Sequence, residues 1–233
     1  AKENYGIEVS EEVGPIDMGL KLADDIFRAY DIRGVVSTDL RPDVVELIGK
    51  ALGTLYPQCQ RVVVGRDGRL TSKQLADHLI SGLRSTGVNV IDIGEVPTPV
   101  LYFAAHALKT GSGLMVTGSH NPPEYNGIKM VMDEKTLFGE MIQSIYDCIK
   151  RDAFSSDNEG SLEQVNILDD YIDAICERVK LKRPLSVAID CGNGVAGPSA
   201  RTLFTQLGCE LTELFCEVDG ELSLAPGIMQ RDQ

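Results

Sequence analysis

The 233-residue sequence lacks an apolar run near the roughly 18 to 20 residues that a helix needs to span a bilayer. Its first 19 residues are acidic and contain no basic segment followed by an apolar one, so they do not read as a secretory signal. The chain also has no long polar tract, and 43% of its residues are hydrophobic. We therefore expect a globular protein with a substantial core and no membrane partner.

Basic residues are scarce as well. Lys and Arg number 22 against 35 Asp and Glu, and the net charge is −13. Binding to a nucleic-acid backbone requires a clustered basic surface, so nucleic acid is excluded as a partner. An anionic small molecule would need a local group of basic side chains, for which the candidates are Arg33, Arg66, Arg69 and Lys129. Of these, Arg69 is expected to be a solvated surface residue.

The cysteines include no C-x-x-C pair and lie far apart, which argues against a metal finger and against a disulfide framework. Several stand in apolar runs, where a reduced cysteine behaves as a small core residue. This usage fits a reducing compartment, and we predict a cytoplasmic protein. The six are Cys59, Cys148, Cys176, Cys191, Cys209 and Cys216.

What the sequence does contain is a repeated order of strand, helix and strand. Apolar runs predict strands over 26–34, 61–65, 88–93, 113–116 and 128–132, and helical spacing predicts helices over 42–56, 100–108 and 137–150. A further helix should start at Thr71 or Ser72 and end before Gly87. This order predicts an α/β fold with mostly parallel pairing and right-handed crossovers.

The segment 151–161 is polar and rich in turn residues, so we place a linker there. After it, the pattern predicts a helix over 167–179, strands over 186–189 and 211–216, and a helix begun by Pro198. The expected organisation is a loosely docked leader over 1–20, a first domain over 21–154, and an incomplete second α/β unit over 155–233.

The stretch with the strongest chemical signal follows the apolar run 113–116 and reads T-G-S-H-N-P-P-E-Y-N-G-I-K over residues 117–129. Gly118 permits a turn, and the two prolines prevent a helix. Asn126-Gly127 predicts a tight turn that returns Lys129 on a second strand. The loop would then bring Ser119, its two following residues and Lys129 together.

That group of side chains favours phosphoryl transfer, since a serine hydroxyl can carry a phosphoryl group and a nearby lysine can move a proton. Acyl transfer fits less well, because the nucleophile-elbow pattern needs glycine where Thr117 and Asn121 stand. A proline-rich loop with one solvated histidine is the alternative that the residues leave open.

The 117–129 stretch closely resembles the phosphoserine loop of the α-D-phosphohexomutases, in particular the bacterial phosphomannomutase/phosphoglucomutase group. The resemblance implies that Ser119 is the phosphoryl carrier, that Lys129 is a general acid/base, and that His120 and Asn121 support the phosphate or the substrate. It also implies a mixed, mostly parallel sheet with helices on both faces.

Other motifs extend the resemblance over about residues 26–220. Y-D-I-R-G at 30–34 resembles a segment that faces the cleft in this family, which implies that Tyr30 and Arg33 contact substrate or the serine phosphate. Arg33 suits phosphate because a guanidinium binds it through two hydrogen bonds. The alternative for Tyr30 is an ordinary half-buried strand aromatic. G-R-D-G-R at 65–69 and V-P-T-P at 96–99 also resemble the family's first domain.

The function that the resemblance implies is reversible transfer of phosphate between the 1- and 6-positions of a hexose phosphate, mannose or glucose, in two steps through phospho-Ser119. The implied activator is hexose 1,6-bisphosphate. The implied metal is Mg²⁺, held in part through the phosphate on Ser119. The implied partners are small hexose phosphates.

Residues 190–197, D-C-G-N-G-V-A-G, support a rival interpretation. Gly192, Gly194 and Gly197 spell G-x-G-x-x-G between a strand and a helix, and Glu217 follows at the distance of a ribose-binding acid. A dinucleotide-binding module is therefore the alternative function. Asp190 opposes it by placing negative charge near a pyrophosphate. The same letters resemble the start of the phosphohexomutases' second domain, where the glycines serve a tight turn and close helix packing.

The sequence has no D-G-D-G-D-R metal loop, sugar-recognition loop or phosphate clamp of the kind that full members of that family carry. We therefore expect a truncated form with little or no mutase activity alone, because the metal and the orientation of the sugar would be lost. A third possibility is a non-catalytic fragment, which could self-associate through its incomplete second unit.

Overall fold

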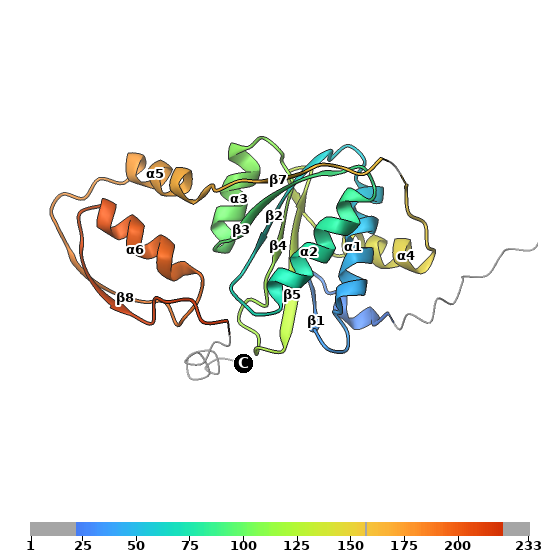
Figure 1. Ribbon diagram of the computed structural model, residues 1–233, viewed down its shortest axis with the longest axis horizontal. Coiled ribbons are helices and arrows are strands. Elements are labelled where there is room, and N and C mark those ends of the chain that lie inside the picture. Colours follow the sequence, from blue (N-terminus) through green and yellow to red (C-terminus); the bar gives the residue numbers. More distant parts are fainter. Residues whose placement is uncertain (1–21, 157, 221–233) are drawn as a thin grey trace, which may run out of the picture.

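The computed structural model describes residues 22–156 and 158–220, and most of them surround one mixed sheet (Figure 1). Its strand order is β1-β5-β4-β2-β3-β7, with β6 beside β5. Strands β4, β2, β3 and β7 run parallel, whereas β5 is antiparallel to β1, β4 and β6. The strands are β1 Ile32–Val35, β2 Arg61–Arg66, β3 Asn89–Glu95, β4 Gly113–Val116, β5 Tyr125–Met132, β6 Lys135–Thr136 and β7 Leu162–Gln164.

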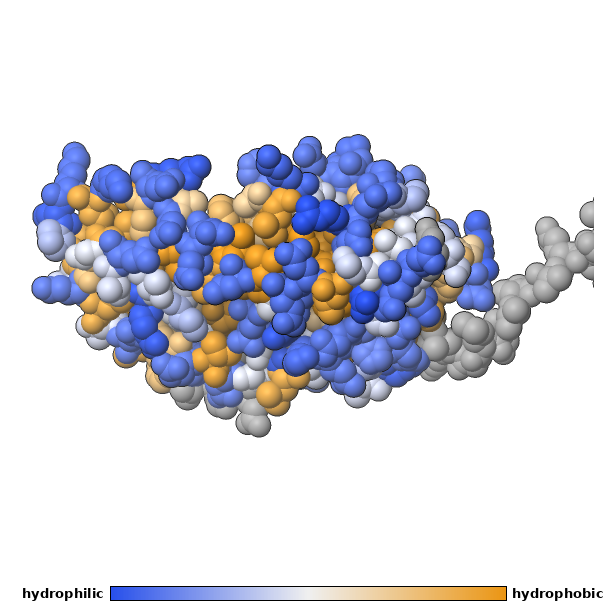
Figure 2. Space-filling model, turned by 45° about the horizontal axis from the view of Figure 1, so that its top comes forward, coloured by the Kyte–Doolittle hydropathy of each residue, from blue (hydrophilic) through white to orange (hydrophobic). Residues whose placement is uncertain are grey.

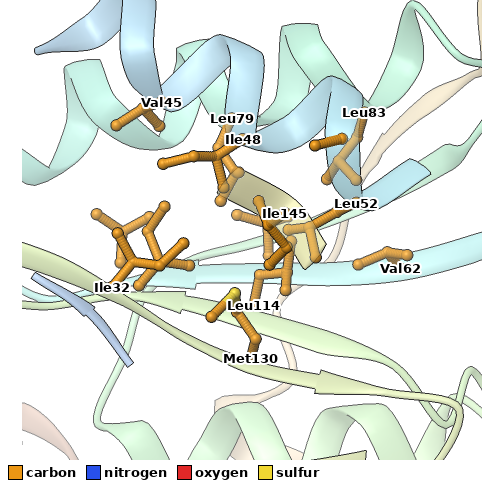
Figure 3. Close-up of a cluster of buried hydrophobic side chains, with 14 of the residues drawn as sticks. Ile32, Val45, Ile48, Leu52, Val62, Leu79, Leu83, Leu114, Met130 and Ile145 are labelled. Atoms are coloured by element: carbon orange, nitrogen blue, oxygen red, sulfur yellow. The ribbon is translucent and has the colours of Figure 1, made fainter. Parts of the chain in front are cut away.

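Helices cover both faces of this sheet, which confirms the predicted mixed α/β class. One face carries α1 (Pro42–Leu55), α2 (Ser72–Arg84) and α4 (Glu140–Lys150), and the other carries α3 (Thr98–Ala107). Successive strand residues point to opposite faces, so Leu114 joins the first core and Met115 the second. Figure 3 shows the first core, where Ile48 and Leu52 of α1 and Leu79 of α2 meet strand residues.

A smaller unit follows the main sheet. Strands β8 (Ser186–Asp190) and β9 (Glu210–Leu214) pair in parallel, and α6 (Ala196–Gln206) connects them. Helix α5 (Leu168–Arg178) joins this unit to the main sheet, since it packs against both α3 and α6. Its Tyr171 meets Phe103 of α3 edge to face, with ring centroids 5.4 Å apart.

The small unit buries little of its own apolar surface. Side chains that stay exposed in it are Val179, Leu185, Leu214, Phe215 and Val218. Figure 2 shows hydrophobic surface gathered in the middle of one face of the molecule, flanked by hydrophilic side chains. A lone two-stranded sheet is marginal in water, so this unit depends on its contacts with the rest of the chain.

Two predicted element boundaries were wrong. The strand expected over 26–34 is only Ile32–Val35, because Asp24–Ile26 forms a 3₁₀ turn and residues 29–31 form a bend. The helix expected from residue 137 begins at Glu140, after Gly139 at φ 51°. The main sheet also includes β7, which follows the linker expected over 151–161 and pairs with β3.

The tight turn expected at Asn126-Gly127 was also wrong, because both residues lie inside β5. The Asn126 side chain is fully buried and donates to the hydroxyls of Thr71 (3.0 Å) and Ser72 (2.8 Å). These tertiary bonds hold the pair in the strand. The chain reverses earlier, where the Tyr125 amide donates to the carbonyl of Pro122 over 3.0 Å.

The predicted leader, 1–20, and the last residues of the predicted second unit, 221–233, lie outside the described residues. Among the helices that the structure does describe, none combines the length and the apolar character that crossing a bilayer requires.

Candidate active site

Two loops leave the sheet at the same edge, because parallel strands β2 and β4 end side by side, with Arg66 paired to Val116. The carboxylate of Asp67 joins these loops. It accepts a hydrogen bond from the Gly118 amide over 3.0 Å and another from the Arg69 amide over 3.1 Å. The Ser72 hydroxyl donates to it as well. The serine loop therefore starts at the carboxyl end of β4, as predicted. Asp67 also links it to the end of the neighbouring strand β2.

Arg69 is the main support of the serine loop. Its guanidinium donates to four backbone carbonyls of that loop, and Nε lies 3.4 Å from the Asp67 carboxylate. The expectation that Arg69 is a solvated surface residue was wrong, since it is only 5% exposed. The acceptors are the carbonyl oxygens of Pro122 (2.7 Å), Tyr125 (3.1 Å), Ser119 (3.2 Å) and Asn121 (2.6 Å).

Burial of the Arg69 guanidinium lowers its pKa below the ordinary arginine value, and the charge and hydrogen bond of Asp67 act in the opposite direction. The group stays a cation, because an arginine pKa lies far above neutral pH. A buried charge is tolerated only when it is paired and hydrogen-bonded, and here one carboxylate and four carbonyls meet that requirement.

Ser119 stands at the bend of the loop in a left-handed conformation, with φ 54°. Its amide donates to the Thr117 hydroxyl over 2.9 Å, and its carbonyl accepts from Arg69. In the part of the chain that the structure describes, the Ser119 hydroxyl itself makes no hydrogen bond to protein. The backbone is therefore held by neighbours while the hydroxyl remains available to a ligand.

Ser119 and His120 line a pocket of about 410 Å³. The first domain contributes the turn at residues 67–69, the segment 96–98, Met115 and Thr117 to this pocket. The small unit supplies the opposite wall, which is the loop from Asp190 to Ala196 after β8. The pocket thus lies between the two predicted domains.

Two of the remaining basic candidates, Lys129 and Arg33, lie on the pocket side of the main sheet. Lys129 is the strand partner of Met115, and cross-strand partners point to the same face. Arg33 is paired with Gly127, two residues from Lys129, so its side chain shares that face. Neither residue is among those that line the pocket.

Arg33 forms an ion pair with Asp31, and its Nε is buried without a partner. Arg66 lies 3.9 Å from the Asp92 carboxylate. Tyr30 is 76% exposed in a bend. The alternative that it is a half-buried aromatic residue of a strand was therefore wrong. The Asn121 side-chain amide donates within the loop, to the Gly118 carbonyl over 3.1 Å.

Sequence reasoning missed Asp67 and the structural role of Arg69. The signal that could have found them is D-G-R directly after a buried strand, at the ligand edge of an open α/β sheet. Asn126 was also missed, because the Asn-Gly pair was interpreted as a turn.

The glycine-rich loop of the small unit does not have the geometry of a dinucleotide site. The Gly192 amide, which a pyrophosphate would need, already donates to the Asp190 carboxylate over 3.0 Å. Glu217, the ribose-binding candidate, forms an ion pair with Arg201 over 2.7 Å. Gly197 lies so close to the Cys216 backbone that a Cβ would overlap its carbonyl, which fits a packing role for this glycine.

The described residues do not complete a Mg²⁺ site. No group of three or more His, Cys, Asp or Glu side chains within 22–156 and 158–220 is arranged to hold a metal ion. Near Ser119, the Asp67 carboxylate is already bonded to Arg69, Gly118 and Ser72. Mg²⁺ prefers several free oxygen ligands, so ligands beyond these residues would be required.

Comparison with known proteins gives one family. The family described as "Phosphoglucomutase/phosphomannomutase, alpha/beta/alpha domain I" matches residues 24–156. A phosphoglucomutase of Neisseria gonorrhoeae is 48% identical over 199 residues, which are 84% of this chain and 43% of that protein. A phosphomannomutase/phosphoglucomutase of Pseudomonas syringae is 48% identical over 208 residues, 88% of this chain and 44% of that protein.

The solved structure of a phosphoglucomutase/phosphomannomutase family protein from Burkholderia thailandensis has a TM-score of 0.82 and 47% identity to this chain. The match covers 87% of this chain and 46% of that one. The chain thus spans less than half the length of the relatives described here. The similarity extends past the matched first domain, since residues 24–156 alone are fewer than the residues aligned.

Proposed function

Because the chain belongs to the phosphoglucomutase/phosphomannomutase family, we propose that it is the phosphoserine-bearing part of a phosphohexomutase. Its reaction is the reversible movement of phosphate between the 1- and 6-positions of glucose or mannose. Ser119 carries the phosphate, and hexose 1,6-bisphosphate is the intermediate and the activator.

The observation that carries this proposal is the environment of Ser119. Ser119 lines a pocket of about 410 Å³ and its hydroxyl makes no hydrogen bond to the described residues, whereas its backbone is held by Thr117 and by the buried cation of Arg69. A rigid nucleophile that reaches an open pocket is what repeated phosphoryl transfer needs, because the reacting atoms must be positioned before the step.

In the proposed step, the bond between phosphorus and Ser119 Oγ breaks while a bond to a sugar hydroxyl oxygen forms. The proton of that hydroxyl must be removed, and Ser119 Oγ must regain one. We assign this proton movement to Lys129, which is the cross-strand partner of Met115 on the pocket side of the sheet. His120 lines the pocket and would contact the phosphate or the sugar.

Arg33 is proposed to bind phosphate, since its cation lies on the same sheet face and its Nε lacks a protein partner. Tyr30 and Asn121 stay predicted substrate contacts. Mg²⁺, when bound, would neutralise phosphoryl oxygens, and the phosphate on Ser119 would be the ligand that this chain offers. The further ligands and the sugar contacts are expected from the portion of the relatives that this chain does not span.

Intact-mass measurement tests the proposal. The protein is incubated with hexose 1,6-bisphosphate, and we expect the mass of one added phosphate, which Ser119→Ala abolishes. Thr117→Ser keeps a hydroxyl beside the Ser119 amide and serves as the control for changes in the loop. A folded wild-type chain that gains no phosphate, or a Ser119→Ala variant that still gains one, contradicts the proposal.

A further inference from the structure

Two thiols meet at the ends of the small parallel sheet. Strand β8 ends at Asp190 and β9 at Leu214, and these two residues are partners. Cys191 follows β8 directly, and its amide donates to the Leu214 carbonyl over 3.1 Å. Cys216 lies two residues after β9, and its Sγ is 3.4 Å from the Sγ of Cys191. The fold thus places in contact two cysteines that are far apart in sequence.

The two thiols differ in accessibility. Cys216 is 4% exposed, whereas Cys191 is partly exposed and lines the pocket opposite Ser119. A small molecule that enters this pocket therefore reaches Cys191 first, with Cys216 directly behind it. Cys216 also donates to the Leu214 carbonyl, while Cys148 donates to the Ala153 carbonyl and Cys176 to the Gln206 side chain.

We propose that Cys191 and Cys216 form a reversible disulfide bond when a small-molecule disulfide enters the pocket. Cys191, as its thiolate, attacks one sulfur of that molecule, whose S–S bond breaks and releases one thiol. The Cys216 thiolate then attacks Cys191 Sγ in the mixed disulfide and releases the second thiol. Both protein thiols are oxidised, the reagent is reduced to two thiols, and the two protein protons end on those thiols.

The new bond would join both ends of the segment 191–216, which contains the whole of α6. A cross-link restricts the unfolded chain, and here it also ties the 190–196 loop to the end of β9. That loop is the wall of the pocket opposite Ser119, so oxidation would restrict the movement of one wall of the candidate site. This inference concerns the thiols alone and does not depend on phosphoryl transfer.

Burial of the Cys191 thiol and the negative charges near it control how fast the bond forms. Burial raises the pKa of the Cys191 thiol to about 11, and its interaction with Cys216 and the negative charges of Asp190 and Glu213 act in the same direction. The thiolate is the attacking form, and it is the minor form of Cys191 at neutral pH. Oxidation should therefore be slow at neutral pH and become roughly tenfold faster per pH unit below the pKa.

The test uses the full chain with oxidised glutathione at pH 8 to 9. We expect the intact mass to fall by two hydrogen atoms and to return after addition of dithiothreitol. Trypsin separates Cys191 from Cys216, and Glu-C cleavage after Glu210 and Glu213 separates Cys216 from Cys209. The cross-linked peptide pair should contain Cys191 and Cys216.

Cys176→Ser is the matched control, because Cys176 is a partly exposed thiol of the neighbouring helix α5. It should oxidise as the wild type does. Cys191→Ser should lose the cross-link, and Cys216→Ala should stop at the glutathione adduct on Cys191. Peptide mapping of the wild type identifies which two cysteines are cross-linked even if a variant fails to fold. Glutathione adducts alone, unchanged thiols, or a cross-link between other cysteines would overturn the proposal.

Discussion

The guanidinium of Arg69 occupies the space where a side chain on Gly118 would stand. A Cβ built on Gly118 would lie well under 3.0 Å from both Cζ and Nε of Arg69 and 2.8 Å from Nη1. The glycine before Ser119 is therefore required by packing, because Arg69 must lie across the loop to reach its carbonyls. The two residues together determine the position of the candidate nucleophile.

Gly118→Ala should destabilise the protein by about 1–3 kcal/mol, because the methyl group forces Arg69 away from its acceptors. It should also slow phosphate uptake at Ser119. Gly113→Ala in β4 is the control, since its Cβ would make ordinary contacts of 3.4–3.5 Å with Leu101 and Ala105. Urea unfolding of both variants measures the difference. Equal stability of the two alanine variants would contradict the packing argument.

Arg69→Lys should cost about 2–4 kcal/mol, since one ammonium cannot bond four carbonyls that point at a planar group. The exposed Arg61→Lys, at the start of β2, should change stability by less than about 0.5 kcal/mol. Denaturant unfolding supplies both values. We also expect faster proteolysis within 119–125 for Arg69→Lys. A wild-type stability and cleavage pattern would show that Arg69 does not support the loop.

Lys129→Met keeps most of the side-chain length and removes the proton-transfer group. If Lys129 moves the proton, phosphate uptake by Ser119 from hexose 1,6-bisphosphate should slow by about 10²–10⁴-fold. Lys135→Met, on the exposed strand β6, should react at the wild-type rate. The readout is the time course of the intact mass. An unchanged rate in a folded Lys129→Met protein would remove Lys129 from the mechanism.

The 233-residue chain should accept a phosphate yet show little or no net interconversion of hexose 1-phosphate and 6-phosphate. The reason is that the described residues offer no complete Mg²⁺ site, and the chain spans less than half the length of its relatives, from which the sugar contacts are expected. A coupled assay measures this, with a full-length relative as the positive control. Turnover comparable with that relative would refute the prediction.

NAD or FAD should leave the melting temperature unchanged, because the Gly192 amide is bonded to Asp190 and Glu217 to Arg201. A ligand that binds only the native state raises stability, so thermal unfolding with saturating nucleotide is a direct check. Hexose 1,6-bisphosphate is the comparison ligand. A shift with NAD that Asp190→Asn strengthens would instead favour the dinucleotide interpretation.

Local signals in the sequence were enough to predict the α/β class and the place of the serine loop. The apolar run 113–116 followed by Gly118 and two prolines predicted a strand ending in a rigid loop, and the strand and the loop that follows it were confirmed. Signals of the same kind failed where distant residues compete. Asn126-Gly127 has the composition of a turn, yet its burial against Thr71 and Ser72 keeps it in β5.

The amino-acid sequence by itself determined which residues are candidates for chemistry: a serine loop with a lysine near it, and a glycine-rich loop about 70 residues later. Hydrophobic periodicity, proline and glycine act over a few residues, so their structural effects can be predicted from the sequence. Only the tertiary structure decided that Arg69 is buried, that the two loops form opposite walls of one pocket, and that Cys191 touches Cys216. These contacts join residues from 25 to more than 70 positions apart, and their energies depend on burial that exists only in the folded chain.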